Sequence, residues 1–199
     1  TIKHGLWILR RFGIILILVC FQGFIGWYMV SSGLVDRVDV SHYRLSLHLV
    51  TAFIILSVIF WKILQIKNIQ KTEISIKLYL VKFFLLLLFL QLIIGAFVSG
   101  MDAGNVYNTW PLMGTSYFPD DSRILEFLNI SVFNNPSIVQ FIHRNLAYLI
   151  VIIYAYLKSL VIKENNKIFI KQIILIVLSL LLQDILGVMT LLSGEKITY

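Results

Sequence analysis

Two histidines, His48 and His143, occupy positions from which an imidazole could ligate a metal within a membrane. Each lies one or two turns inside the same end of a long apolar segment, roughly 7–9 Å from that end at 1.5 Å per residue. An arginine is close to each, Arg44 four residues before His48 and Arg144 directly after His143. Neutral imidazole is a common axial ligand of haem iron, and arginines can pair with haem propionates. The alternative, which stays open, is that each histidine only hydrogen-bonds a neighbouring helix.

A further ionisable group, Asp184, lies inside another apolar segment beside Gln183. Charged side chains in membrane segments are rare and are usually functional or paired. We expect Asp184 to pair with Arg44 or Arg144. Participation in proton movement is the alternative.

The composition excludes an ordinary soluble domain. Of 199 residues, 59% are hydrophobic and 14% are charged, against roughly 45–50% and about 25% in soluble domains. The net charge of +7 would indicate nucleic-acid binding only if the basic residues formed a water-facing patch, but here they flank apolar runs. A single cysteine, Cys20, excludes a disulfide or a thiolate cluster within the chain.

Five apolar stretches are long enough to cross a bilayer as helices. They cover residues 12–30, 45–64, 78–98, 139–162 and 170–192. All three prolines fall in the one long connection, between the third and fourth stretches. The small and aromatic residues at 95–104 and 107–114 suggest that this connection forms a close-packed outer cap over a ligand. The predicted fold class is therefore an all-α, polytopic membrane helical bundle.

The positions of the cations predict the orientation of the five spans, since cytoplasmic loops are enriched in lysine and arginine. Twelve of the 17 basic residues lie at one side: Lys3, Arg10, Arg11, Lys62, Lys67, Lys71, Lys77, Lys82, Lys158, Lys163, Lys167 and Lys171. This side is predicted to be cytoplasmic, as is the N-terminal end. The first, third and fifth spans then run outward, and the two histidines lie near the outer face.

The three outward-running spans share a pattern in which a glutamine precedes a glycine by four residues. The pairs are Gln22 and Gly26, Gln91 and Gly95, and Gln183 and Gly187. Residues four apart lie on one face of a helix, so the pattern suits either a packing seam or a direct role at a ligand. The first and third pairs are 161 residues apart, which predicts two related four-helix halves.

This repeat predicts a longer protein of eight spans, of which the chain holds the middle five. A counterpart of His48 would lie about ten residues past Tyr199, and a counterpart of His143 would lie before Thr1. The first residue is Thr1 rather than methionine, which agrees with a fragment lacking both ends.

Several segments resemble haem A synthases of the alphaproteobacterial and mitochondrial type, a family that acts in cytochrome oxidase assembly. The resemblance covers nearly the whole chain in order. The matching segments are GWYMVSSGL at 26–34, VSHYRLSLHL at 40–49, GAFVSGMDAG at 95–104, YNTWPLMG at 107–114, VQFIHRNLAY at 139–148 and QxxLGVMTLL at 183–192.

The resemblance implies an eight-helix protein built from two related four-helix halves. Residues 1–67 would be the third and fourth helices, on the substrate haem side. Residues 68–199, with the outer loop 99–137, would be the fifth to seventh helices, on the haem b side. His143 would ligate the haem b iron and His48 the iron of the haem O substrate, with Arg144 and Arg44 as further haem-binding residues. Although they match in depth, the two histidines would therefore serve different haems.

The family reaction oxidises the C8 methyl group of haem O to a formyl group and so makes haem A for cytochrome c oxidase. The family's catalytic glutamate belongs to a Glu-x-x-His-Arg motif, and the comparable motif here begins with Gln140. The catalytic glutamate would therefore lie outside this chain, and we expect the chain alone to be inactive. The outer-loop cysteine pairs of Gram-positive members are absent from it.

The resemblance further implies a bacterial inner membrane, with a mitochondrial one as the alternative. Haem O synthase and an electron donor such as a ferredoxin are the expected partners besides the lipid bilayer, no nucleic acid is expected, and homo-oligomerisation is left open. Two other functions compete. A b-type cytochrome electron-transfer subunit would use the same histidines without modifying a substrate. A transporter would bind no haem.

Overall fold

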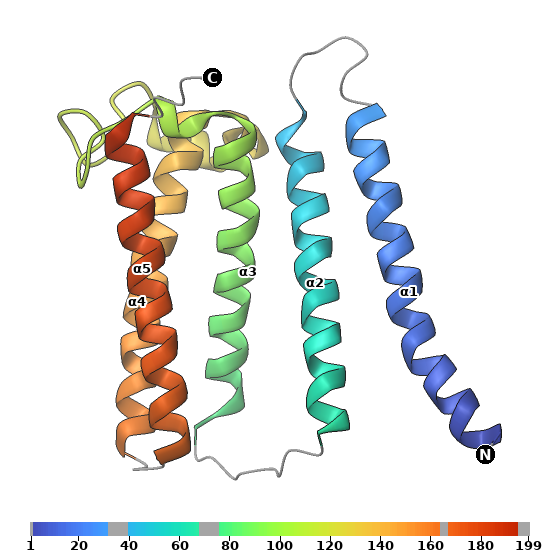
Figure 1. The fold of residues 1–199 in the computed structure, drawn as a ribbon. Helices are drawn as coiled ribbons and strands as arrows, with labels where there is room; N and C mark the ends of the chain where they lie inside the picture. The colour runs from blue at the N-terminus through green and yellow to red at the C-terminus, as the bar shows by residue number, and fades with distance from the viewer. Residues whose placement is uncertain (1, 32–39, 68–75, 164–166, 195–199) are drawn as a thin grey trace. The chain divides into compact units, whose positions relative to one another are not determined.

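Five long helices dominate the computed structural model, which describes residues 2–31, 40–67, 76–163 and 167–194 (Figure 1). The helices are α1 (Ile2–Ser31), α2 (His42–Ile66), α3 (Leu78–Gly100), α4 (Pro136–Lys163) and α5 (Lys167–Ser193). Each contains a stretch that is long and apolar enough to cross a membrane, and the described residues form no strand. Both the all-helical class and the five predicted spans are confirmed.

The helix ends extend beyond the apolar stretches from which they were predicted. α4 begins at Pro136, three residues before the predicted start of its span. The side-chain oxygen of Asn135 accepts hydrogen bonds from the backbone N–H groups of Ser137 (3.0 Å) and Ile138 (3.4 Å). These bonds satisfy two of the free N–H groups of the first turn, and proline is well suited to the first helical position because it has no N–H to satisfy.

The chain divides into two compact units, residues 1–72 and 73–199. In the first unit, α1 packs against α2, and the buried residues of these two helices include Ile25, Ser46, Thr51 and Ile55. The hydroxyl of Thr51 donates to the carbonyl of Leu47 within α2 (2.7 Å), so this buried polar group is satisfied by its own helix. The assignment of the units to the two halves of an eight-helix protein stays a prediction.

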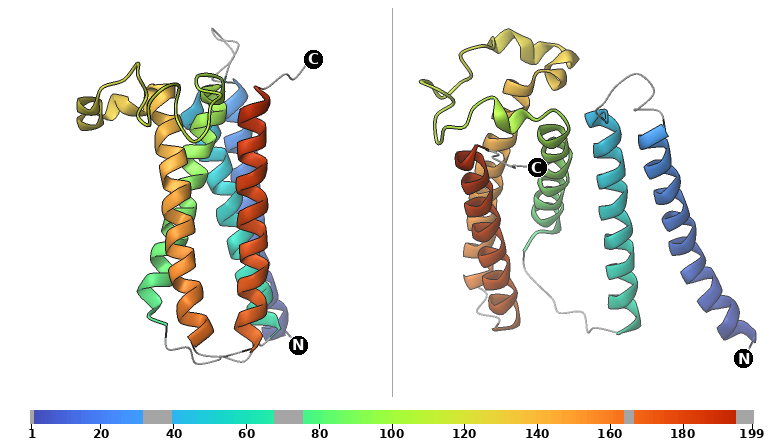
Figure 2. Two further views of the ribbon diagram at one scale, coloured as in Figure 1. Left: turned by 90° about the vertical axis from the view of Figure 1, so that its left-hand side faces the viewer. Right: turned by 45° about the horizontal axis from the view of Figure 1, so that its top comes forward.

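In the second unit, α4 is the central helix, packing against both α3 and α5. Figure 2 shows α5 beside α4 and nearer to it where α4 ends and α5 begins than at the opposite end. The core between these three helices consists of Phe84, Leu87, Ile150, Tyr154, Leu157, Val161 and Ile173. The hydroxyl of Tyr154 donates to the carbonyl of Ile173 (2.5 Å) and ties α4 to α5. A smaller cluster of Ile94, Phe97 and Val139 lies nearer the predicted outer end.

The long connection between α3 and α4 folds into three short 3₁₀ helices and the turns between them. These are η1 (Ala103–Asn105), η2 (Ile124–Leu128) and η3 (Ile130–Asn134), and they gather at the same end as the start of α4 (Figure 2). Within this connection the side chains of Ala103, Met113 and Val132 are buried. The outer loop predicted at 99–137 is therefore an ordered cap and not an extended linker, although α3 includes its first two residues.

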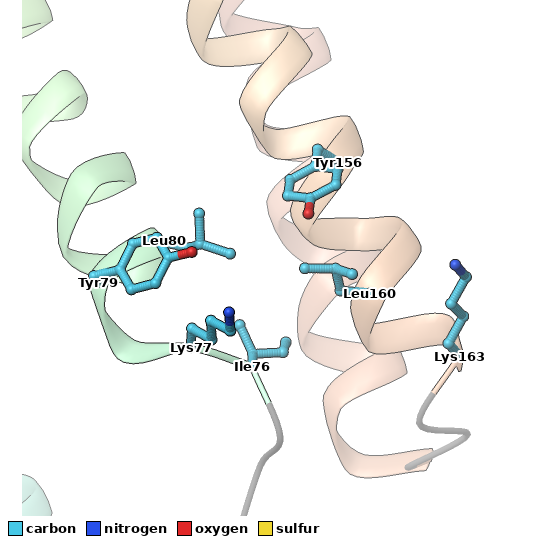
Figure 3. A pocket seen from close by; sticks show the side chains of 7 residues that line it. All are labelled: Ile76, Lys77, Tyr79, Leu80, Tyr156, Leu160 and Lys163. Carbon is cyan, nitrogen blue, oxygen red and sulfur yellow. The ribbon is translucent and has the colours of Figure 1, made fainter.

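The opposite end of the second unit has a cavity of about 380 Å³ (Figure 3). It is lined by Ile76, Lys77, Tyr79, Leu80, Tyr156, Leu160 and Lys163. Tyrosines with lysines beside apolar residues are typical of the interface between a membrane and water. The cavity has no histidine and lies at the far end of α3 and α4 from Gln91 and His143, so it is not the candidate site.

The Tyr154–Ile173 hydrogen bond generates the first prediction. Tyr154→Phe should lower the stability of the protein by about 0.5–1.5 kcal/mol, because it removes a buried hydrogen bond and leaves the ring in place. Tyr156→Phe, on the exposed side of the same helix, is the matched control and should change stability little. Reversible unfolding of the purified protein in mixed micelles measures both, and equal effects of the two substitutions would contradict this role of Tyr154.

Candidate functional site

His48 lies against α1, where the glutamine and the glycine of the first repeat contact its imidazole. The Nε2 atom of Gln22 is 3.2 Å from Nδ1 and 3.3 Å from Nε2 of the ring. The same Nε2 donates to the backbone carbonyl of His48 at 3.0 Å. A Cβ atom added to Gly26 would be 3.1 Å from Cε1 of the ring. We call Gln22, Gly26 and His48 the first histidine site.

His143 is held in the same way in the second unit, by the second copy of the repeat on α3. Nε2 of Gln91 is 3.4 Å from Nε2 of the imidazole. A Cβ added to Gly95 would lie 3.2 Å from Cε1. Gln91, Gly95 and His143 form the second histidine site. In both sites one helix therefore supplies the amide and a glycine that leaves room for the ring, and the next helix along the chain supplies the imidazole.

The glycines have a steric role in both sites. A Cβ contact of 3.1–3.2 Å is closer than carbon atoms normally approach one another. Alanine in place of Gly26 or Gly95 would thus push the imidazole away from the helix. The glutamine–glycine repeat is confirmed as a packing seam in these two copies, and the residue that it packs against is the histidine.

The third copy of the repeat, Gln183 and Gly187 on α5, has no such partner in the described part of the chain. Gln183 is exposed, and a Cβ added to Gly187 would meet nothing within 4 Å. The histidine predicted for this copy, about ten residues past Tyr199, stays a prediction.

Arg144, the residue after His143, is bound to the connection above it. Its guanidinium donates to the carbonyls of Thr109 (2.8 Å), Tyr107 (2.9 Å) and Leu112 (3.3 Å). Gln140, one turn earlier on α4, donates to the carbonyl of Tyr107 as well (3.0 Å). Sequence reasoning placed Arg144 beside a haem propionate, and the structure shows that it also fixes the cap over the second histidine site.

Further side-chain contacts join the same connection to α4. The indole N–H of Trp110 donates to the hydroxyl of Tyr148 (3.0 Å), and the hydroxyl of Tyr117 donates to the side-chain oxygen of Asn145. The sequence suggested a cap from the small and aromatic residues of this segment. It did not identify Gln140, Tyr148 and Asn145 as the groups that hold it. Gln140 and Tyr148 each lie four residues from Arg144 and so share its face of α4, which was a usable signal.

Two aspartates in the cap are held as carboxylates. Hydrogen bonds from Ser116 (2.6 Å) and Thr115 (3.1 Å) lower the pKa of Asp120. For Asp121, partial burial raises the pKa, but hydrogen bonds from Ser137 (2.6 Å) and from Tyr107 outweigh it and bring the pKa below its ordinary value. Because Ser137 is in the first turn of α4, Asp121 links the cap to the start of that helix.

The other two charged residues singled out in the sequence are placed differently. The guanidinium of Arg44 lies over the ring of Tyr28, 5.4 Å from its centroid, so in the first unit this cation contacts α1. Asp184 is partly buried on α5, and the described structure shows no ion pair between it and Arg144. The expected pairing with Arg144 is therefore not found.

The second histidine site has the unsatisfied polar atoms that a bound group would need. Four buried atoms without a hydrogen-bond partner lie on residues of this site and the turn around it: His143 Nδ1, Gln91 Oε1, Gln140 Oε1 and Arg144 Nε. The described residues contain no cluster of three or more histidine, cysteine or acidic side chains. A single imidazole with a spare nitrogen suits axial ligation of a haem and not a metal ion held by protein groups alone. The residues present therefore fit a haem.

Comparison with known proteins gives a consistent result. Residues 2–199 match the family described as cytochrome oxidase assembly protein. The chain is 47% identical over 185 residues to Heme A synthase of Pelagibacter ubique, which covers 93% of the chain and 54% of that protein. It is 40% identical over 181 residues to Heme A synthase of the Wolbachia of Brugia malayi, covering 89% and 52%. For Heme A synthase of Rickettsia bellii the identity is 40% over 187 residues, covering 90% and 54%.

The chain thus spans about half the length of these curated relatives. No solved structure matches it.

The close approach at Gly26 generates a prediction that needs no ligand. Gly26→Leu should destabilise the protein by about 1–3 kcal/mol, because the added side chain overlaps His48. Gly23→Leu, three residues earlier on α1, is the control, since a Cβ there meets nothing within 4 Å. Unfolding in mixed micelles compares the two, and a Gly23 variant as unstable as the Gly26 variant would contradict a specific contact with His48.

The lowered pKa of Asp121 predicts an acid dependence of stability. A carboxyl whose pKa is lower in the folded state stabilises the fold at pH values above its unfolded pKa, and that stabilisation is lost as the pH falls through the folded pKa. Wild-type protein should therefore lose stability from about pH 5 downward.

Asp121→Asn should be less stable than wild type at neutral pH and should lose less on acidification. Asp102→Asn is the control, because the side chain of Asp102 is exposed and makes no hydrogen bond in the described structure. Unfolding midpoints between pH 3 and pH 7, on the scale of ordinary aspartate titration, give the comparison. Parallel curves for wild type and Asp121→Asn would show that the link to Ser137 contributes nothing.

Proposed function

Because the chain belongs to the cytochrome oxidase assembly protein family, we propose that it is the central part of a haem A synthase. The reaction is the oxidation of a methyl group of haem O, at C8, to the formyl group of haem A. The observation that carries this proposal is the second histidine site, where a partly buried imidazole has a buried nitrogen, Nδ1, without a hydrogen-bond partner.

His143 is the proposed ligand of a resident haem b. A bound haem b supplies one-electron redox chemistry, and the residues of the chain hold it in place and keep water away. α3 fixes one side of the imidazole through Gln91 and Gly95. The cap, bound to α4 through Arg144 and Gln140, covers the outer end of the site. Arg144 Nε has no partner, which leaves this cation a donor for a haem propionate.

His48 is the proposed ligand of the haem O substrate. A glutamine and a glycine of the preceding helix lie against its ring, as they do at His143, which supports related roles in two related halves. Arg44, which lies over the ring of Tyr28, is proposed as its propionate partner. The second histidine of each haem, and the catalytic glutamate, are expected in segments outside residues 1–199.

The surroundings of the reaction follow from its chemistry. Conversion of a methyl group to a formyl group is a four-electron oxidation, so the electrons that leave the substrate need an acceptor. A redox protein such as a ferredoxin is the proposed partner that would exchange electrons with the haem-loaded protein. Haem O reaches the site from the enzyme that makes it, a haem O synthase. We place the protein in the bacterial inner membrane, with the capped end of α4 on the periplasmic side, because most cations lie at the opposite ends of the spans.

The function is tested with the full-length protein in a host that makes haem O but no haem A. We expect extracted haem to contain haem A, and we expect His143→Ala to lose the haem b absorbance. Leu149→Val, at an exposed position on α4, is the control and should retain both. Extraction of haem b alone, with haem O present in the host, would show an electron-transfer cytochrome instead, and the absence of any haem would favour a transporter.

A further inference from the structure

Gln91 contacts the ring of His143 but is not a group that could itself bind iron. Its amide lies 3.4 Å from the imidazole Nε2. Within the described part of the second unit, no other polar side chain is recorded within hydrogen-bond distance of the ring. The amide of Gln91 is therefore placed to satisfy one ring nitrogen and leave the other, Nδ1, without a partner.

A neutral imidazole has one N–H group and one lone pair. When the lone pair ligates a metal, the N–H on the other nitrogen is almost always donated to an acceptor, and this bond fixes the rotation of the ring and its strength as a ligand. An imidazole whose N–H is buried without such an acceptor has an unsatisfied donor, which is unfavourable. The acceptor available at His143 is the amide oxygen of Gln91.

The amide of Gln91 can present either end to the ring. Its Oε1 is buried and has no hydrogen-bond partner. A turn of 180° about the last side-chain bond exchanges Oε1 and Nε2 at nearly the same positions. Because Oε1 makes no hydrogen bond, this rotation of the Gln91 amide breaks none at that atom.

The equivalent glutamine of the first histidine site is not equally free. Nε2 of Gln22 donates to the backbone carbonyl of His48 at 3.0 Å. A carbonyl oxygen can only accept, so the amide must keep its nitrogen at this position. Gln22 is thus fixed as a donor toward His48, whereas Gln91 can act as an acceptor toward His143.

From this difference we propose that Gln91 is a positioning residue of the second histidine site. Its amide oxygen would accept the Nε2–H of His143 and leave Nδ1 as the nitrogen that ligates the iron. The contact sets the rotation of the imidazole and increases the electron density that it donates to the iron. Gly95 completes the arrangement by letting the ring lie close enough to α3 for the bond to form. The inference rests on the proposed function, since it assumes that His143 ligates a haem.

The test is the midpoint potential and electron paramagnetic resonance spectrum of the haem that depends on His143, in the full-length protein reconstituted in nanodiscs. Gln91→Leu removes the acceptor and should raise the midpoint potential, because the imidazole becomes a weaker electron donor. Haem affinity should fall about 10- to 100-fold, as is usual when the hydrogen-bond partner of a metal ligand is lost. Gln91→Glu keeps an acceptor of nearly the same shape and should shift the potential in the opposite direction, downward.

Leu90→Val is the matched control, because it changes the neighbouring residue, whose side chain is 40% exposed. It should leave the potential and the spectrum unchanged. Shifts of the same sign in Gln91→Leu and Gln91→Glu, or no shift in either, would overturn the inference, since a residue that only fills space cannot give opposite effects. If Gln91→Leu fails to fold, the downward shift in Gln91→Glu decides alone.

Failure of the proposed function gives a different result. If His143→Ala retains all the haem of the wild-type protein, His143 is not a ligand, and the function and the inference both fail. If His143→Ala loses a haem but neither Gln91 variant changes the potential, the function stands and only the role of Gln91 is rejected.

Discussion

The structure depends on a close contact between an imidazole and the helix that precedes it in the chain. At both histidine sites a glycine leaves room for the ring, and a glutamine four residues earlier contacts both of its nitrogens at His48 and one of them at His143. In lipid such a contact is directional, because the surrounding hydrocarbon offers the ring no hydrogen bond. It therefore fixes the register of α1 against α2, and of α3 against α4, at the depth where the histidines lie.

Around the second histidine site this contact is combined with a cap. Arg144 and Gln140 take their acceptors from the backbone of the α3–α4 connection, so residues on either side of His143 along α4 hold the connection over it. The carboxylate of Asp121 adds a bond to Ser137 at the start of the helix. The imidazole thus lies against α3, at a level of α4 where the residues before and after it hold the cap, and Gln91 is the one polar side chain recorded on its ring among the described residues.

Much of the site could be predicted from single residues. The sequence was enough to predict the depth of His48 and His143 and to recognise the glutamine–glycine repeat, because both follow from helical periodicity and the length of a span. The nearby arginines could be read from the sequence directly. What periodicity could not supply was the pairing between helices. Gln22 and Gln91 were recognised as a repeat but not as partners of the histidines. The three cap carbonyls that accept hydrogen bonds from Arg144 were not foreseen, and its pairing with a propionate stays a prediction.

The sequence by itself determined the five membrane helices, since runs of about 20 apolar residues can satisfy their backbone in lipid only as helices. It also determined the family, through segments that match in order along the chain. Only the tertiary structure decided which groups meet. Whether Gln91 faces His143, whether Gly187 faces anything, and whether Asp184 reaches Arg144 depend on the rotation and separation of packed helices. These are set by many side chains at once and are not encoded in the spacing of any one motif.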